Sequence, residues 1–434
     1  MHSEHVVHGV YSGHIVHSGR FTLDDRARSI LHYLPVDVPP GAQGIEVTLS
    51  YDSSAGVLDL GCFGPAGFRG WSGGARDHYA ITAAAATPGY LPGELEEGTW
   101  QVALGLHRVG PAGVEFEVRA RIAGVAVEPP GPPPPTPQRP PPRGLPAPGG
   151  MRWLAGDLHA HTVHSDGDRT IDELACLGVE AGLDFLAVSD HNTTSHHPFL
   201  AAVSRRHGIT LIPAQEVTTD IGHANAFGDI GWIDFRRSAE HWATDTEGRG
   251  GLLSINHPLA ADCAWRRPMR GRPPLAEVWH WSWLDTRWGG PIAWWQAWGA
   301  GSTADRRGDA GALATPVGGS DFHSSREGRP LGVPTTWVLA AADDGAADPD
   351  GRCAAVLAGL AAGRTAITAD RAAPAVLRLG AEIVVLDAAD TLLVDATGQR
   401  TAVRGKRFRL DATDRPSSGW YVERHDGGVV ALAG

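Results

Sequence analysis

The feature that most constrains this chain is a pair of histidines placed just after a short apolar run. Residues 153–155 read Trp-Leu-Ala, and His159 and His161 follow within Gly-Asp-Leu-His-Ala-His-Thr. Residues two apart on an extended strand point to the same side, so both imidazoles can face one point. Imidazoles that converge in this way are suited to binding a metal ion. The motif therefore predicts a strand with a metal site at its end.

Four further clusters of histidine and carboxylate residues follow other short apolar runs. The runs and the residues that end them are 185–189 with Asp190-His191, 211–215 with Glu216, 252–256 with His257, and 317–320 with Asp321. Between the run 153–155 and the run 185–189, a capping box formed by Thr170 and Glu173 predicts a helix that reaches about Ala181 and stops at Gly182. Alternating strands and helices with polar residues at the strand ends are typical of a (β/α) barrel.

Pattern and composition divide the chain into four parts. These are an all-β sandwich at 1–127, a Pro-rich linker at 128–150, the α/β barrel at 151–370 and a small β-rich segment at 371–434. Apolar and polar residues alternate with period two at 45–51 and 114–122, as in half-buried strands. The linker holds 12 of the 32 prolines, which favours an extended, semi-rigid spacer. In the last part, residues 420–432 predict a hairpin that turns at Asp426-Gly427-Gly428.

Composition limits the classes of function. The net charge of −12 argues against a surface that holds long nucleic acid, which normally needs a basic stripe. The four cysteines form no Cys-x-x-Cys pair, and we expect mostly buried thiols in a reducing compartment. No signal peptide or membrane-spanning run is recognisable, so we expect a cytoplasmic protein that does not bind membranes.

The wording around these clusters resembles the PHP domain (polymerase and histidinol phosphatase family). The Gly-Asp-Leu-His-Ala-His-Thr stretch and Gly-Gly-Ser-Asp-Phe-His at 318–323 are most similar to the CehA/McbA-like metallohydrolase branch. The resemblance covers about residues 151–370, roughly half of the chain. It implies a distorted seven-stranded (β/α) barrel that holds two to three divalent metal ions.

The resemblance also implies nine metal ligands, shared among three ions. The first ion takes His159, His161, Glu216 and Asp321; the second takes Asp166, His191 and His323; the third takes His223 and His257, with Glu216 bridging it to the first. Some family members place a histidine where Asp166 stands, and His164 is close enough in sequence to compete for that role.

The ligand types point to a class of chemistry. Imidazole together with carboxylate suits Zn, Mn or Fe, and the absence of thiolates argues against a closed structural zinc site. Three ions and three carboxylates leave a cluster charge of about +3, which attracts a phosphate anion. A metal-bound water can ionise near pH ~7 and attack the ester as a hydroxide.

Three further residues are candidates for catalysis. Asp190 precedes a ligand histidine and could orient an imidazole or a water, or it could cap a loop. His196 could touch the substrate or protonate a leaving group, or it could belong to an exposed polar loop. Arg329 could clamp a phosphate through its guanidinium fork.

Eight of the fifteen tryptophans lie between Trp265 and Trp298. Trp279, Trp281 and Trp283 alternate as on a strand, whereas Trp294 and Trp298 are spaced as on one helix face. The segment could form an aromatic wall for a ring-bearing leaving group, with His280 as a substrate contact. It could equally pack helices onto the barrel.

The leading functional hypothesis is a metal-dependent phosphoesterase that hydrolyses a small phosphate mono- or diester at a trinuclear site. The first alternative keeps the metals but acts on an aryl carbamate or carboxylester. The second is a non-catalytic metal-binding module. The expected partner is a small-molecule ester rather than long nucleic acid, and the sequence indicates no oligomeric state.

Overall fold

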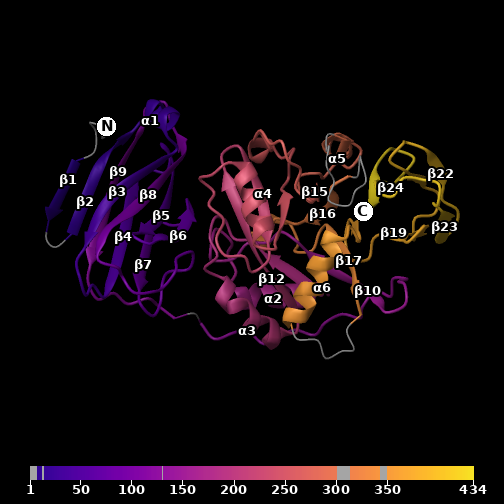
Figure 1. Cartoon of the computed structure of the whole chain (residues 1–434), viewed down its shortest axis with the longest axis horizontal. Coiled ribbons are helices and arrows are strands. Elements are labelled where there is room, and N and C mark those ends of the chain that lie inside the picture. Colours follow the sequence, from indigo (N-terminus) through magenta and orange to yellow (C-terminus); the bar gives the residue numbers. More distant parts are fainter. Residues whose placement is uncertain (1–6, 12–13, 130, 301–312, 343–348) are drawn as a thin grey trace. The chain divides into compact units, whose positions relative to one another are not determined.

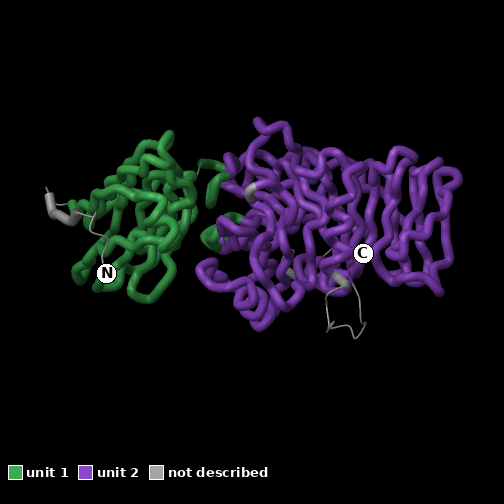
Figure 2. Tube along the Cα trace, turned by 90° about the horizontal axis from the view of Figure 1, so that it is seen from above, with its two compact units in different colours: residues 1–132, 163–166, 190–196 green, residues 133–162, 167–189, 197–434 purple. Residues whose placement is uncertain are grey.

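The computed structural model describes residues 7–11, 14–129, 131–300, 313–342 and 349–434. Contacts divide the chain into two compact units, coloured separately in Figure 2. Unit 1 comprises residues 1–132 with two later segments, 163–166 and 190–196, and unit 2 comprises the remainder. His2 and His5, two of the N-terminal histidines, lie outside the described residues. In the described part, no helix is long and apolar enough to cross a membrane.

Unit 1 is built from two antiparallel sheets that share one apolar core (Figure 1). One sheet has the order β1-β2-β9-β4-β7 and the other has the order β3-β8-β5-β6. The elements are β1 (Val7–Tyr11), β2 (His14–Phe21), α1 (Leu23–Arg28), β3 (Leu31–Val38), β4 (Gly44–Tyr51), β5 (Gly56–Gly64), β6 (Gly67–Gly73), β7 (His78–Thr82), β8 (Gly98–Val109) and β9 (Val114–Ile122). The two period-two runs coincide with β4 and β9, whose alternate apolar side chains enter the core.

Unit 2 is a mixed α/β structure with many strands and few helices. Its strands are β10 (Met151–Asp157), β11 (Phe185–Val188), β12 (Thr210–Thr219), β13 (Gly222–Phe227), β14 (Leu252–Ile255), β15 (Leu275–His280), β16 (Thr315–Gly319), β17 (Thr335–Ala341), β18 (Thr365–Thr368), β19 (Ala375–Leu379), β20 (Glu382–Leu386), β21 (Leu392–Val394), β22 (Arg400–Ala402), β23 (Arg407–Asp411), β24 (Trp420–Glu423) and β25 (Val429–Ala433). Its helices are α2 (Ile171–Glu180), α3 (His197–His207), α4 (Ala239–Gly248), α5 (Gly290–Ala300) and α6 (Pro349–Ala361), with 3-10 turns η1 (Ala261–Cys263) and η2 (Ser325–Glu327).

One long sheet organises unit 2, in the order β16-β15-β14-β13-β12-β11-β10-β17-β18-β25-β24-β21-β22. The sheet curls, so that β16 at one end of the strand order also contacts β17 and β18. Gly318 N donates to Thr336 Oγ1 at 2.8 Å, and Thr365 Oγ1 donates to Pro316 O at 2.8 Å. The strand ends from β10 to β16 therefore lie around one region.

The sheet departs from a regular strand, loop and helix alternation. β13 runs antiparallel to both β12 and β14, and no helix separates it from β12. Gly222, at φ 137°, permits the tight turn that returns the chain. Glu216, which was expected to end a strand at 215, lies inside β12, because the β-branched Val217, Thr218 and Thr219 continue the pairing.

Other local expectations can be compared directly. Helix α2 begins after Thr170, whose side chain and that of Glu173 form the predicted capping box. The C-terminal hairpin forms between β24 and β25, and β25 continues the long sheet by pairing with β18. The expectation of mostly buried thiols is wrong: of the four cysteines, Cys62 is buried and the other three are partly exposed, and none of the four forms a disulfide.

Residues 133–150 belong to unit 2 and lie along it in an extended conformation. Arg143 Nη1 donates to Ala373 O at 2.6 Å, and Arg371 Nη1 donates to Pro141 O at 2.9 Å. Trp153 Nε1 donates to Pro146 O at 2.9 Å. Proline lacks an N–H but keeps its carbonyl, so arginine and tryptophan donors can hold a polyproline segment in place.

The capping box gives a first testable expectation. Thr170→Ala removes the side-chain acceptor of Glu173 N, so we expect a loss of about 1 kcal/mol in the free energy of unfolding. Urea unfolding followed by circular dichroism measures it. Thr170→Ser is the matched control and should stay near wild type, whereas equal losses in both variants would contradict the capping role.

Candidate metal centre

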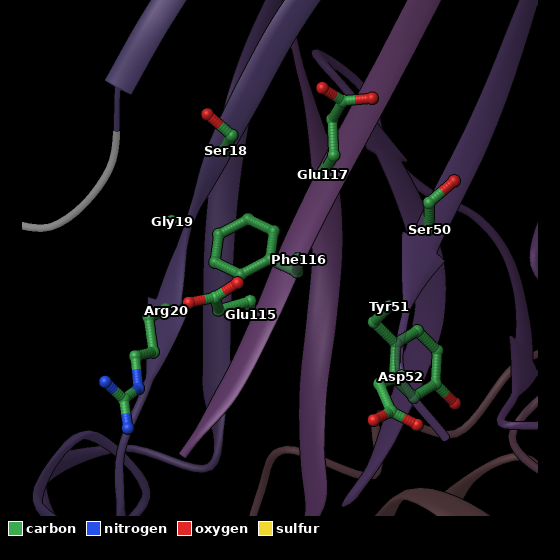
Figure 3. Close-up of a pocket in the computed structure, with 9 residues that line it drawn as sticks. All are labelled: Ser18, Gly19, Arg20, Ser50, Tyr51, Asp52, Glu115, Phe116 and Glu117. Carbon is green, nitrogen blue, oxygen red and sulfur yellow. The ribbon is translucent and has the colours of Figure 1, made fainter. Parts of the chain in front are cut away.

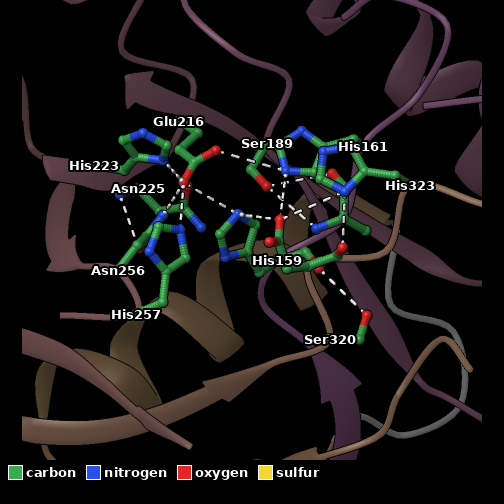
Figure 4. A network of polar contacts seen from close by, with 12 residues as sticks. His159, His161, Ser189, Glu216, His223, Asn225, Asn256, His257, Ser320 and His323 are labelled. Atoms are coloured by element: carbon green, nitrogen blue, oxygen red, sulfur yellow. Dashed lines mark hydrogen bonds and ion pairs between the residues drawn. The ribbon is translucent and has the colours of Figure 1, made fainter. Parts of the chain in front are cut away.

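Histidine and carboxylate side chains gather where the strands of unit 2 end. His159 and His161 follow β10, His257 follows β14, and Asp321 and His323 follow β16. Glu216 and His223 project from the neighbouring strands β12 and β13, and Figure 4 shows the network that they form with the strand-end residues. Seven of the nine predicted ligands are thus in unit 2.

Glu216 is the first centre of this network. Its Oε1 lies 3.3 Å from His159 Nε2, 3.2 Å from His223 Nδ1 and 3.2 Å from His257 Nε2. Asn256 Nδ2 donates to the same oxygen at 2.8 Å. One carboxylate oxygen of Glu216 thus has three ring nitrogens and one amide nitrogen around it.

Asp321 is the second centre. Its Oδ1 lies 3.2 Å from His159 Nε2, 3.0 Å from His161 Nε2 and 3.7 Å from His323 Nδ1. Its Oδ2 lies 3.2 Å from His280 Nε2. Because His159 contacts both Asp321 and Glu216, the two carboxylates belong to one site.

Burial and charge act strongly on these groups. Burial lowers the pKa of His159, but the charges of Glu216, Asp321 and Glu277 outweigh it and raise that pKa well above its ordinary value. Burial raises the pKa of Asp321, but the charge of His159 and hydrogen bonds from His161 and His280 hold it well below its usual range. The ionised form of Asp321 is thus stabilised by the imidazoles around it.

The donor set fits divalent metal ions. His159, His161, Glu216 and Asp321 each offer one ligand atom, and these atoms lie within 4.8 Å of one another. His159 Nε2 is buried and has no hydrogen bond of good geometry within the described residues, although two carboxylates face it. A buried ring nitrogen aimed between two carboxylates is suited to coordination.

Glu277 on β15 is a site residue that the sequence pattern did not identify. It is buried, its Oε1 lies 3.1 Å from His159 Nδ1, and its Oε2 accepts from His257 N at 2.7 Å. His159 therefore turns Nδ1 to Glu277 and Nε2 to the carboxylates Glu216 and Asp321, an arrangement that would set its tautomer if it bound a metal ion. The available signal was a single carboxylate inside the apolar run 275–278.

Asp157, at the end of β10, is a second residue that the pattern missed. Its carboxylate accepts from His159 N at 3.1 Å, Ser320 N at 3.0 Å and Gly332 N at 2.7 Å. Burial raises its pKa, and these backbone donors counteract the shift. Asp157 thereby joins the His159 motif to the Asp321 motif.

Close packing and backbone strain accompany the ligands. Gly319 approaches so closely that a Cβ there would lie 2.4 Å from His159 Cβ. His257 and Asp321 have φ angles of 24° and 50°, which non-glycine residues rarely adopt. Such strain is held in place by the surrounding structure and is concentrated at functional sites.

The remaining predicted ligands, Asp166 and His191, lie in the two short segments of unit 1. His191 Nε2 is 3.6 Å from Asp166 Oδ1. Nearby, Ser165 Oγ donates to Asp190 Oδ1 at 2.7 Å, and Asp190 Oδ2 is 3.2 Å from His196 Nδ1. Asp190 and His196 are fully buried, so within unit 1 they form a buried pair rather than an exposed loop.

The tryptophan segment only partly follows its predicted pattern. β15 ends at His280, so Trp279 is on the strand while Trp281 and Trp283 lie in the following turn, where Trp283 N donates to His280 O. Trp294 and Trp298 stack on one face of α5, as their spacing predicted.

Arg329, the predicted phosphate clamp, contacts this segment. Its guanidinium carbon lies 3.3 Å from the centroid of the Trp281 ring, and its Nη1 is 3.1 Å from Glu327 Oε2. Trp281 follows His280 directly, and the two rings are 5.2 Å apart. The indole on which Arg329 packs is thus one residue from His280, which contacts Asp321.

Unit 1 also has a hollow on one sheet, shown in Figure 3. It lies over β2, β4 and β9, and is lined by Ser18, Gly19, Arg20, Ser50, Tyr51, Asp52, Glu115, Phe116 and Glu117. Phe116 stacks on the buried Phe21 with ring centroids 4.4 Å apart, as part of the core. The lining includes no histidine or cysteine, and the hollow does not share the chemistry of the metal cluster.

Comparison with known proteins gives limited matches. No protein-family model matches the chain. A segment of 65 residues is 40% identical to the 5'-3' exoribonuclease Rnm of Salmonella typhimurium, covering 14% of this chain and 22% of that protein. The chain thus spans about a fifth of the length of the curated relative that it matches.

Three solved structures are similar at 17% identity. A two-domain protein from Bacteroides vulgatus, described as containing a predicted PHP-like metal-dependent phosphoesterase, has a TM-score of 0.38 over 68% of this chain and 91% of its own. A proposed metal-dependent phosphoesterase from Bifidobacterium adolescentis has a TM-score of 0.28 over 41% and 90%. An amidohydrolase from Chromobacterium violaceum, with bound sulfate and no metal, has a TM-score of 0.29 over 40% and 89%.

Glu277 gives a test of how the ligands are oriented. Glu277→Gln keeps the volume but removes the charge beside His159 Nδ1, so we expect metal affinity to fall about 10- to 100-fold while the fold is retained. Calorimetric titration of Mn²⁺ into the metal-depleted protein measures this. Glu247→Gln, at an exposed position of α4, is the matched control, and an unchanged affinity for Glu277→Gln would contradict the orienting role.

Proposed function

We propose that this protein is a metal-dependent hydrolase that acts on a small phosphate mono- or diester. The observation that carries the proposal is the convergence of His159, His161, His223, His257 and His323 on the carboxylates Glu216 and Asp321. That donor set is the one that catalytic Zn, Mn and Fe sites use. We propose three ions, with Asp166 and His191 completing the ligand set because the chain places them five residues after His161 and two after Ser189.

The residues of the site have distinct tasks in this proposal. Divalent ions bound here would supply Lewis acidity and lower the pKa of a coordinated water. Glu216 and Asp321 hold the cluster together, and Glu277 keeps His159 in one tautomer. Asp190 fixes the orientation of His196, which we propose as the proton donor to the leaving group.

Arg329 and Trp281 form the proposed substrate-binding side of the site. A guanidinium held against an indole ring offers both a cation for a phosphate oxygen and an aromatic edge for a ring. This arrangement also favours a second candidate, hydrolysis of an aryl carbamate or carboxylester by the same metals. The two candidates differ in the electrophile and share the site.

Several finer features belong to the same proposal. We propose that the curled sheet is the distorted seven-stranded barrel of the PHP domain, of the CehA/McbA-like branch, and that the two sheets of unit 1 form a β-sandwich. Cytoplasmic location and a small-molecule ester as the partner are proposed from the free cysteines and the net charge of −12.

The test combines metal analysis with turnover of matched esters. We expect two to three ions of Zn, Mn or Fe per chain, and release of phosphate from aryl phosphate mono- or diesters. His159→Ala should lose most of the bound metal and lower turnover by at least about 100-fold, because one ring contacts both carboxylates. His241→Ala, on the exposed face of α4, is the control.

Each other outcome excludes part of the proposal. Bound metal with turnover of aryl carbamates or carboxylesters only would replace the phosphoesterase with the second candidate. Turnover restricted to a short RNA oligonucleotide would shift the substrate toward that of the Salmonella relative. Absence of metal in protein purified without chelator would contradict the hydrolase itself and favour a non-catalytic module.

A further inference from the structure

Unit 1 contains a hydrogen-bonded connection between its two sheets and the segments that carry Asp166 and His191. The segments 163–166 and 190–196 belong to the same compact unit as residues 1–132. The contacts come from two points on the two-sheet part, Arg76 in the turn between β6 and β7, and Gly89 in the loop after β7.

Arg76 binds the first segment through its guanidinium group. Its Nη1 donates to Ser165 O at 2.9 Å, and its Nη2 donates to Val163 O. Val163 and Ser165 flank His164 in the chain, and Ser165 immediately precedes Asp166. A planar guanidinium can satisfy two acceptors at once, which fixes the direction of the backbone between them.

The peptide of Gly89 binds the second segment in a reciprocal way. Gly89 N donates to Ser195 Oγ at 3.0 Å, and Thr193 Oγ1 donates to Gly89 O at 2.8 Å. Gly89 has a φ of 100°, and a Cβ there would lie 2.9 Å from His164 O. The close approach of the loop after β7 to the segment 163–166 therefore requires glycine at position 89.

The two segments are also joined to each other. Ser195 Oγ lies 2.8 Å from His164 Nδ1, and Ser165 Oγ donates to Asp190 Oδ1 at 2.7 Å. Asp166 directly follows Ser165, and His191 directly follows Asp190, so both predicted ligands are next to this second hydrogen bond. Buried hydrogen-bonded networks of this kind make a rigid support, because a broken member leaves a buried polar group unsatisfied.

Electrostatics adds to the geometry. Burial lowers the pKa of Arg76, while the charges of Tyr90, Asp190 and Asp166 oppose that shift. The positive charge of Arg76 thus interacts with two carboxylates of the segments that it binds.

We propose that Arg76 is a positioning residue for Asp166 and His191, two of the proposed metal ligands, and that the two-sheet part of unit 1 supports the segments that carry them. This inference rests on the proposed function, since it assumes that these two side chains bind metal. It gives residues 1–132 a function in metal binding: the second ion is bound only when Arg76 and Gly89 hold the segments that carry Asp166 and His191.

The experiment measures metal binding by the full-length chain, independently of turnover. Metal-depleted wild type, Arg76→Met and Thr193→Val are titrated with Mn²⁺ in equilibrium dialysis. We expect both variants to bind about one ion per chain fewer, or to bind their weakest ion about 10- to 100-fold more loosely. Arg76→Lys, which keeps one cationic donor, should recover part of the affinity.

Controls separate positioning from general destabilisation. Arg121→Met removes another arginine of unit 1, one that pairs with Glu46 on the neighbouring strand β4, and it should bind Mn²⁺ as wild type does. Circular dichroism and thermal unfolding establish that each variant is folded. Thr193→Val provides the decisive measurement if Arg76→Met does not fold, because it removes one hydroxyl at nearly constant volume.

The outcomes distinguish this inference from the proposed function. Wild-type binding of two to three ions with unchanged binding in folded Arg76→Met and Thr193→Val would overturn the positioning role alone. Equal weakening in Arg121→Met would also overturn it, because the effect would then reflect the stability of unit 1. Failure of wild type to bind Mn²⁺, Zn²⁺ or Fe²⁺ would overturn the proposed function and this inference together.

Discussion

The rest of the structure depends on two buried carboxylates, Glu216 and Asp321. An ionised carboxyl group removed from water is costly unless charges or hydrogen bonds compensate for it. In this protein the compensation comes from imidazole nitrogens on several strand ends, with six ring nitrogens within 3.7 Å of one or the other carboxylate. The sheet must therefore curl enough to bring β10, β12, β13, β14 and β16 to one place.

Around these two carboxylates, Asp157 and Glu277 fix the orientation of the neighbouring histidines and backbone. Asp157 joins the β10 and β16 motifs through backbone N–H groups, and Glu277 holds His159 Nδ1 and the backbone of His257. The unusual φ angles of His257 and Asp321 are maintained by this packing. Preorganisation of this kind lowers the cost of assembling a charged site, because the ligands need not be reoriented when an ion binds.

Much of the site could be predicted from the sequence because its ligands are local to strand ends. The spacing of His159 and His161 and the apolar runs before His257 and Asp321 identified residues that the structure brings together. The sequence pattern did not identify Glu277 and Asp157, because each is a single carboxylate whose role depends on contacts with residues far away in sequence. The strand β13 was not predicted for a related reason: its pairing with β12 and β14 is decided by a tight turn and by the neighbouring strands, not by its own short pattern.

The sequence by itself determined the local elements: the period-two strands of unit 1, the capped helix α2, the C-terminal hairpin and the chemical identity of the donor set. These follow from spacing, capping and turn chemistry that act over a few residues. Only the tertiary structure decided that Glu216 and Asp321 share His159, that Glu277 orients it, and that Arg76 and Gly89 bind the segments carrying Asp166 and His191. Those contacts join residues up to 162 positions apart, and such pairings depend on how whole sheets pack and curl, which no local pattern specifies.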